Sequence, residues 1–220
     1  MTDQSSRYYF TFLRHGESVG NAEERHQGRA DFPLTSLGKV QAQALADRWN
    51  SEGVAFDYII SSTLSRAMQT AEILASKFKL SIEPDPLWVE RHNGNLAGLR
   101  HEDAKVLYPQ PDFINPYESY AGTGEGDWSL FLRAGQALQG LMQRPTGRYL
   151  VVSHGGLLNQ VMYAIVGIAP YPNSMGPRFR FDNTGFACTS YEPASHIWRI
   201  ICLNDHVHAK GINPEELTDI

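Results

Sequence analysis

The chain has 220 residues, of which 42% are hydrophobic and 20% charged, and its 19 basic and 24 acidic residues give a formal net charge of -5. This size and composition predict one soluble domain over residues 1–220, and the acidic balance excludes a general attraction to nucleic acid or to an anionic membrane. Residues 1–7 lack the profile of a secretory signal, and the longest apolar run, residues 157–169, is shorter than the ~20 residues that span a bilayer. We therefore expect a cytoplasmic protein without nucleic-acid or membrane partners.

Strands and helices are predicted to alternate along the chain. Continuous apolar or aromatic runs indicate strands buried on both faces, and apolar residues at helical spacing indicate helices packed on a sheet. The expected strands cover residues 8–13, 56–61, 149–153, 186–191 and 198–203. The expected helices cover residues 37–49, 64–78, 128–142 and 157–166. The third of these helices is expected to bury a face that includes Leu132, and the last two strands indicate a hairpin that extends the same sheet.

This order predicts an α/β fold, a three-layer α/β/α sandwich with a mostly parallel central sheet of about six strands and helices on both faces. Ligands bind such sheets at the carboxyl ends of the strands, where Arg14 and His15 follow the first strand and His154 follows the third. Residues 108–126 are rich in proline and glycine and show no regular pattern, which is typical of a functional loop. We therefore expect a substrate-capping region around residues 91–127.

Two other groups of side chains bear on metal and redox chemistry. Cys188 and Cys202 lie in alternating apolar stretches, which favours buried free thiols over a disulfide. His206 and His208 would face one side of a strand, but no third ligand of the right kind is nearby, so we expect solvated residues and no metal site. A sheet edge or an apolar helix face is compatible with a homodimer, and the sequence does not indicate which surface would be used.

Several short blocks of residues form a recognisable series. Arg14-His15-Gly16-Glu17-Ser18 stands at the tip of the first strand, with Asn21 six positions after the histidine. Later blocks are Gln27-Gly28, Ser61-Ser62, Ser65-Arg66-Ala67, Glu90 with Gly94 and Gly98, Ser153-His154-Gly155-Gly156, and Asn183. The series resembles the histidine phosphatase superfamily, which includes the cofactor-dependent phosphoglycerate mutases, over nearly the whole chain. The resemblance implies a phosphoglycerate mutase-like fold and a phosphohistidine intermediate on His15.

The same residues suit phosphoryl transfer, which needs positive charge around the equatorial oxygens and an in-line nucleophile and leaving group. Arg14 and Arg66 are suited to grip two phosphate oxygens through charge-assisted, bidentate hydrogen bonds. His15, by resemblance the nucleophile, must attack as a neutral imidazole. His154 is expected to donate a hydrogen bond to the transferring group and to add positive charge there. By resemblance, Glu90 is the general acid and base.

Substrate binding is expected from a second set of residues: Asn21, Gln27, Gly28, Arg91 and Gly155. Asn21 would be a neutral donor to a phosphate oxygen. Four arginines are expected to be able to reach the site from other segments, namely Arg91, Arg100, Arg178 and Arg180. We expect a small phosphomonoester as the ligand, and neither a cofactor nor a metal ion.

The sequence favours hydrolysis over mutase activity. Residues 90–99 are similar to the mutase version of this block, but the mutases have a tyrosine where Asn93 stands, a lysine about where His101 stands, and a following arginine pair that grips the substrate carboxylate. Residues 106–132 contain no Lys or Arg. A mutase must hold a bisphosphate while it reorients, which needs basic residues for the second anionic end. We therefore expect a metal-independent phosphomonoester hydrolase, with a phosphoglycerate mutase or a non-catalytic phospho-ligand binding protein as alternatives.

Overall fold

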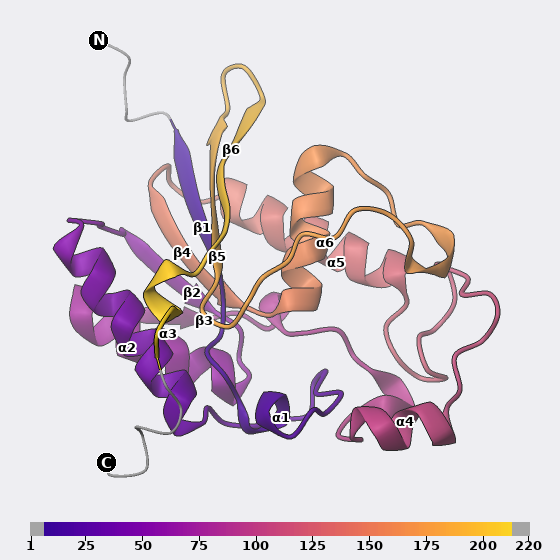
Figure 1. Ribbon diagram of the computed structural model, residues 1–220. Helices are drawn as coiled ribbons and strands as arrows, with labels where there is room; N and C mark the ends of the chain where they lie inside the picture. Colours follow the sequence, from indigo (N-terminus) through magenta and orange to yellow (C-terminus); the bar gives the residue numbers. More distant parts are fainter. Residues whose placement is uncertain (1–6, 213–220) are drawn as a thin grey trace.

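The computed structural model describes residues 7–212 and contains one six-stranded sheet with helices on both faces (Figure 1). The strands are β1 (Tyr8–Arg14), β2 (Tyr58–Ser61), β3 (Ile82–Pro84), β4 (Arg148–Ser153), β5 (Phe186–Glu192) and β6 (Ile197–Asp205). They lie in the order β3-β2-β4-β1-β5-β6, in which β1 to β4 are parallel, β5 is antiparallel to β1, and β6 is antiparallel to β5. The predicted α/β fold with a mostly parallel sheet is confirmed, and the short edge strand β3 was not predicted.

Four longer helices and two short ones connect the strands. They are α1 (Val19–Ala22), α2 (Ser36–Ser51), α3 (Ser65–Phe78), α4 (His101–Leu107), α5 (Asp127–Met142) and α6 (Gly155–Val166). Helices α2 and α3 cover one face of the sheet, where Leu45 and Leu74 pack with Ile59. Helices α5 and α6 cover the other face, where Leu130 and Val161 belong to the second buried cluster. The sheet is therefore the middle layer of three.

Strand β1 is buried on both faces, as its continuous apolar sequence predicts. Phe10 and Phe12 belong to the cluster under α5 and α6, whereas Leu13 belongs to the cluster under α2 and α3. Alternate side chains of a strand point to opposite faces, so both helical layers pack against this one strand. Its neighbours are β4 on one side and β5 on the other, which places its carboxyl end in the middle of the sheet.

Three expectations about individual side chains are wrong. Leu132 is 58% exposed, because α5 buries the face that carries Leu130 and Ala134, which lie one helical turn apart. His206 and His208 do not share a strand, since β6 ends at Asp205 and a 3₁₀ turn over Val207–Ala209 follows. Cys188 and Cys202 are free thiols that pair across β5 and β6, but they are half-buried rather than buried.

Residues 1–6 and 213–220 lie outside the described part of the chain. Most of the N-terminal segment that we expect to lack an export signal therefore also lies outside it. Within residues 7–212, no group of three His, Cys, Asp or Glu side chains is placed to hold a metal ion. Over the same residues, no helix has the length and apolar character needed to cross a membrane.

Candidate active site

The carboxyl ends of β1 and β4 bring two histidines together. The two strands are parallel neighbours whose register pairs Arg14 with Ser153, so His15 and His154 follow at equivalent positions. Their ring centroids are 5.1 Å apart, and the residues are 3% and 0% exposed, respectively. The register of the sheet therefore places the motifs of His15 and His154 side by side, although they are far apart in the sequence.

Close backbone packing fixes the loop that carries His15. A Cβ atom on Gly38, at the start of α2, would lie 2.0 Å from the Glu17 carbonyl oxygen, and one on Gly16 would lie 2.5 Å from the Gly38 carbonyl oxygen. Both distances are shorter than any side chain tolerates, so the loop can rest on α2 only because both positions are glycine. The Gly16 N–H also donates to the Thr70 hydroxyl of α3, at 3.1 Å.

Hydrogen bonding determines which nitrogen of His15 carries the proton. Nδ1 lies 2.6 Å from the Gly16 carbonyl oxygen, which can only accept, so Nδ1 must be protonated. Nε2 in turn accepts from Nε–H of Arg66 at 3.2 Å. Burial, reinforced by Arg66 and Arg14, holds the pKa of His15 well below the ordinary value of 6.5. The ring is therefore neutral near pH 7, with a lone pair on Nε2.

Carbonyl oxygens orient the two site arginines. Arg66 is 1% exposed and donates to the carbonyl oxygens of Gly28 at 2.7 Å and Ala30 at 3.1 Å. Arg14 donates to the Phe181 carbonyl oxygen at 2.7 Å, while its buried Nε has no hydrogen-bond partner within residues 7–212. Burial lowers the pKa of Arg66 to about 10 and also lowers the pKa of Arg14. Both guanidinium groups remain charged at neutral pH.

His154 is anchored by a serine that follows β2. Its Nε2 lies 2.7 Å from the Ser62 hydroxyl, whose oxygen also accepts from the Leu64 N–H at 3.3 Å. Its Nδ1 is buried without a partner within residues 7–212. Burial, with Arg66 and His15 adding to it, holds the pKa of His154 well below 6.5. The His154 ring is thus neutral, and the positive charge of the site resides on the arginines.

The Glu90 carboxylate lies at the N-terminus of α6. It accepts from the backbone N–H groups of Gly156 at 2.9 Å, Leu157 at 3.0 Å and Arg91 at 2.8 Å. The N-terminus of a helix favours negative charge, so the N-terminus of α6 holds the Glu90 carboxylate beside the residues that follow His154. A Cβ atom on Gly156 would lie 2.5 Å from Oε1 of Glu90, so glycine is needed for this approach.

The remaining predicted residues surround this centre in different ways. Asn21 Oδ1 accepts from Nδ2 of Asn183 at 3.2 Å, and the same Nδ2 donates to the His15 carbonyl oxygen at 3.2 Å. Gln27 Oε1 accepts from the Ser18 hydroxyl at 2.7 Å, while Gly28 orients Arg66 through its carbonyl group. Sequence reasoning did not select Asn183 or Ser62 as site residues, although both stood in the recognised blocks.

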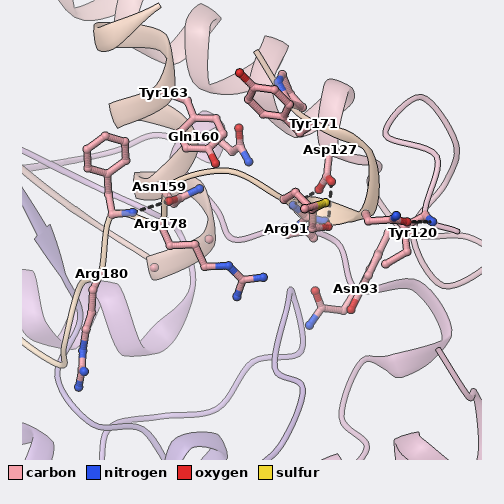
Figure 2. Close-up of a pocket in the computed structure, with 18 of the residues that line it drawn as sticks. Arg91, Asn93, Tyr120, Asp127, Asn159, Gln160, Tyr163, Tyr171, Arg178 and Arg180 are labelled. Carbon is pink, nitrogen blue, oxygen red and sulfur yellow. Dashed lines mark hydrogen bonds and ion pairs between the residues drawn. The ribbon is translucent and has the colours of Figure 1, made fainter. Parts of the chain in front are cut away.

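A cavity of about 670 Å³ lies beside this centre (Figure 2), and it is lined by neighbours of the two histidines but by neither histidine itself. Three of the lining residues are neighbours of the site. Gly155 follows His154, the Gly156 N–H donates to Glu90, and the Phe181 carbonyl oxygen accepts from Arg14. Its other walls come from the expected capping region, from α6 and from the segment 170–181. They include Arg91, Asn93, Gln110, Tyr120, Asp127, Asn159, Gln160, Tyr163, Tyr171, Arg178 and Arg180. The predicted substrate-binding residues Arg91 and Gly155 thus face one space.

The fold is that of the histidine phosphatase superfamily. The sequence model of the histidine phosphatase superfamily (branch 1) matches residues 10–206, and the chain belongs to that superfamily. It is 32% identical over 206 residues to a probable phosphoglycerate mutase, GpmB of Yersinia enterocolitica, with 89% of this chain and 92% of that protein covered. The resemblance found in the sequence blocks is therefore confirmed.

Two solved structures support the fold assignment. YhfR of Bacillus stearothermophilus superposes with a TM-score of 0.78 at 26% identity, covering 92% of this chain and 100% of that chain. A mycobacterial glucosyl-3-phosphoglycerate phosphatase, solved in complex with VO3, superposes with a TM-score of 0.73 at 25% identity, covering 90% and 98%. The chain thus resembles both mutase-like and phosphatase members of one fold.

Proposed function

We propose that this protein is a phosphomonoester hydrolase that works through a phosphohistidine on His15. The observation that carries the proposal is the unprotonated Nε2 of His15, which lies in a buried site against the Arg66 guanidinium. A neutral imidazole nucleophile beside fixed positive charge is what attack on a phosphate dianion requires. Arg14 and Arg66 supply the charge stabilisation that bound metal ions supply elsewhere, so we propose that the reaction needs no metal.

In the first half of the reaction, the phosphate replaces His15 Nε2 as the acceptor of the Arg66 hydrogen bond. Nε2 then attacks phosphorus, the bond from phosphorus to the leaving oxygen breaks, and that oxygen takes the electron pair and a proton from Glu90. The hydrogen bond from Nδ1 to Gly16 holds the ring and stabilises the positive charge that develops on it. When the Ser62 hydroxyl donates to Nε2 of His154, Nδ1–H of that ring is left to donate to the phosphoryl group.

In the second half, water attacks the phosphohistidine. The phosphorus–nitrogen bond breaks, its electron pair returns to Nε2, and the proton of the water passes to Glu90. Three backbone N–H groups donate to the Glu90 carboxyl group, which holds it in place for both proton transfers. The products are the free alcohol and inorganic phosphate.

Charge pairing in the capping region supports hydrolysis over mutase activity. Arg91 is paired with Asp127, and Arg133 is paired with Glu125 at 2.7 Å, so neither cation is free to hold a second phosphate. Within residues 7–212, Arg178 lines the cavity without any carboxylate partner. One exposed guanidinium contributes about 0–1 kcal/mol per ion pair, which orients a leaving group but does not retain a bisphosphate while it turns around.

Mutase activity is the second candidate. The name of the Yersinia relative favours it, as does the likeness of residues 90–99 to the mutase block. The mycobacterial relative, by contrast, is named as a phosphatase of glucosyl-3-phosphoglycerate. Both names describe esters whose leaving portion carries an acid, and the two reactions differ only in the fate of the phosphohistidine.

The test compares phosphate release from a panel of phosphomonoesters with interconversion of phosphoglycerates, all in EDTA. Wild type, His15→Ala and the matched control His196→Ala are assayed, since His196 lies in the β5–β6 turn and contacts Tyr191. We expect release by wild type and the control, an acid-labile phosphoenzyme in both, and neither in His15→Ala. Interconversion without release would establish a mutase instead, and a wild type that forms no phosphoenzyme would support a binding role.

A further inference from the structure

A short turn before β5 holds the backbone of both Arg14 and His15. The turn covers residues 182–185. The Gly185 carbonyl oxygen accepts from the Arg14 N–H at 3.1 Å, and the Thr184 N–H donates to the His15 carbonyl oxygen at 3.2 Å. The backbone at the tip of β1 is therefore fixed by a segment that is far from it in the sequence.

The contact with Thr184 controls the peptide group that follows the His15 side chain. The His15 carbonyl group and the Gly16 N–H are the two ends of this planar group, and the Gly16 N–H donates to the Thr70 hydroxyl at 3.1 Å. Contacts at both ends prevent its rotation. The next carbonyl oxygen, that of Gly16, accepts the proton of His15 Nδ1. Loss of the Thr184 contact would therefore loosen the acceptor that keeps the lone pair of His15 on Nε2.

Thr184 makes this contact from a conformation that threonine disfavours. Its φ is 54°, in the left-handed region, where a β-branched side chain crowds the backbone. Such strain persists only where neighbouring contacts enforce it, and it is concentrated at functional sites. Thr184 is fully buried, and its hydroxyl group makes two hydrogen bonds.

One of these two hydrogen bonds comes from His208, in the 3₁₀ turn after β6. The Thr184 hydroxyl donates its single proton to the Asn183 carbonyl oxygen at 2.7 Å, so its oxygen accepts from Nε2–H of His208, at 2.8 Å. Burial lowers the pKa of His208 to about 4, so the ring is neutral at neutral pH. Its Nδ1 is buried without a partner within residues 7–212. Among these residues, the Nε2–H bond to Thr184 is thus the one hydrogen bond of the ring.

The ring of His208 is fixed independently of Thr184. Arg48 of α2 donates to both carboxylate oxygens of Asp205 at 2.7 and 2.8 Å, which holds the end of β6. The segment after β6, drawn in yellow, lies beside α2 (Figure 1). The His208 ring stacks on the Phe186 ring, with 6.4 Å between centroids and 23° between planes. The ring can therefore impose a position on the Thr184 hydroxyl.

We propose that His208 is a positioning residue for His15. Its Nε2–H holds Thr184 in the left-handed conformation from which the Thr184 N–H binds the His15 carbonyl group. Neither His208 nor Thr184 lines the cavity, so the effect passes through the backbone and not through a contact with substrate. The inference rests on the hydrolase proposed above, in which His15 is the nucleophile, and adds to it a residue that determines the geometry of the nucleophile.

The test uses replacements of equal length at position 208. The glutamine amide has N–H donors and methionine has none, so His208→Gln and His208→Met differ in the bond to Thr184. In Thr184→Gly, the positive φ is relaxed but the hydroxyl group is lost, so this variant keeps the test valid if His208→Met does not fold. The control is Ala137→Gly, which weakens α5 in the cluster on the other face of the sheet.

Rapid-quench measurement with para-nitrophenyl phosphate gives the rate of phosphohistidine formation, and competitive inhibition by inorganic phosphate gives the strength of phosphate binding. We expect His208→Met and Thr184→Gly to lower the rate about ten- to hundredfold, as for a slightly misplaced nucleophile, and to change the inhibition constant about twofold or less. His208→Gln should recover most of the rate, and Ala137→Gly should keep it. Nitrogen NMR spectra of folded His208→Met should show a smaller share of the Nδ1-protonated form of the His15 ring.

Three results would overturn the inference while leaving the hydrolase intact. They are a wild-type rate in His208→Met, an equal loss in His208→Met and His208→Gln, and an equal loss in Ala137→Gly, which would make general destabilisation the cause. Failure of the proposed function looks different, because wild type would then form no phosphohistidine. The NMR spectra would in that case still decide whether His208 fixes the His15 ring, since they need no activity.

Discussion

At the residue scale, the reactive state of His15 follows from three neighbours. Gly16 accepts the Nδ1 proton, while Arg66 and Arg14 oppose protonation of a ring that is already buried. An isolated histidine, with a pKa of about 6.5, would be partly protonated at pH 6. The site instead keeps His15, the proposed nucleophile, neutral through mildly acidic pH, so we expect that protonation of His15 does not limit the reaction there.

Replacement of Glu90 by glutamine tests its proton transfer. With an alkyl phosphomonoester, whose leaving oxygen needs a proton, Glu90→Gln should lower kcat by about 10²- to 10⁴-fold. With para-nitrophenyl phosphate, whose phenolate leaves unaided, formation of the phosphoenzyme should be affected much less. Rapid-quench measurement of the phosphohistidine with both substrates separates the two effects. Equal losses with both substrates would contradict the assignment of a general acid.

At the element scale, the sequence predicted the longer strands and helices because their apolar periodicity is strong, and it missed what periodicity does not encode. Strand β3 has three residues and ends in Pro84, so it carries no alternating pattern. In α5, small residues such as Ala134 and Ala137 lie on the buried face. The prediction relied on larger apolar residues such as Leu132 and therefore placed the buried face on the wrong side of the helix.

The candidate site likewise has a part that the sequence predicted and a part that it did not. The residue types and their order were visible because the motifs are local in sequence. Their geometry depends on contacts between distant segments, such as the bond from Arg66 to Gly28 or from the Gly156 N–H to Glu90. The neutral tautomer of His15 and the unpaired Arg178 likewise follow only from the placement of neighbours that no local pattern specifies.

The junction between α2 and the His15 loop permits a controlled test. Gly38→Ala places a Cβ atom 2.0 Å from the Glu17 carbonyl oxygen, whereas a Cβ atom at Gly135, in α5, meets no atom within 4 Å. We expect Gly38→Ala to destabilise the protein by about 1–3 kcal/mol through overpacking. Gly135→Ala should stabilise it by about 0.5–1 kcal/mol, since alanine favours helix. Urea unfolding measures both, and destabilisation of equal size by the two variants would exclude this explanation.

At the scale of the whole molecule, buried neutral histidines make stability depend on pH. The pKa values of His15 and His154 are held well below 6.5 by burial, and burial also lowers the pKa of His208 to about 4. The unfolded chain binds protons at these positions from about pH 6.5 downwards, whereas the folded protein does not. The contribution to stability is therefore complete above pH 6.5 and is lost as the pH falls towards 4.

We accordingly expect the free energy of unfolding to decrease between pH 7 and pH 5, with a slope of up to about 1.4 kcal/mol per pH unit for each histidine involved. Urea titrations at several pH values measure it. His208→Asn should reduce the slope by the share of one proton and leave the rest, to which His15, His154 and His26 contribute, since burial also lowers the pKa of His26. A free energy that is flat over this range, or that rises as the pH falls, would contradict the neutral state of these rings.

The hydrogen bond from Arg14 to the Phe181 carbonyl oxygen has a consequence for protein engineering. The segment 170–181 both lines the cavity and ends at the residue that orients a site arginine. A library that randomises the whole segment would also replace the buried Phe181 side chain, whose packing positions this carbonyl group, and would thereby disturb the proposed phosphate binding. Diversity confined to the tip, residues 171–178, with residues 179–181 kept, would alter the leaving-group pocket while preserving the support of Arg14.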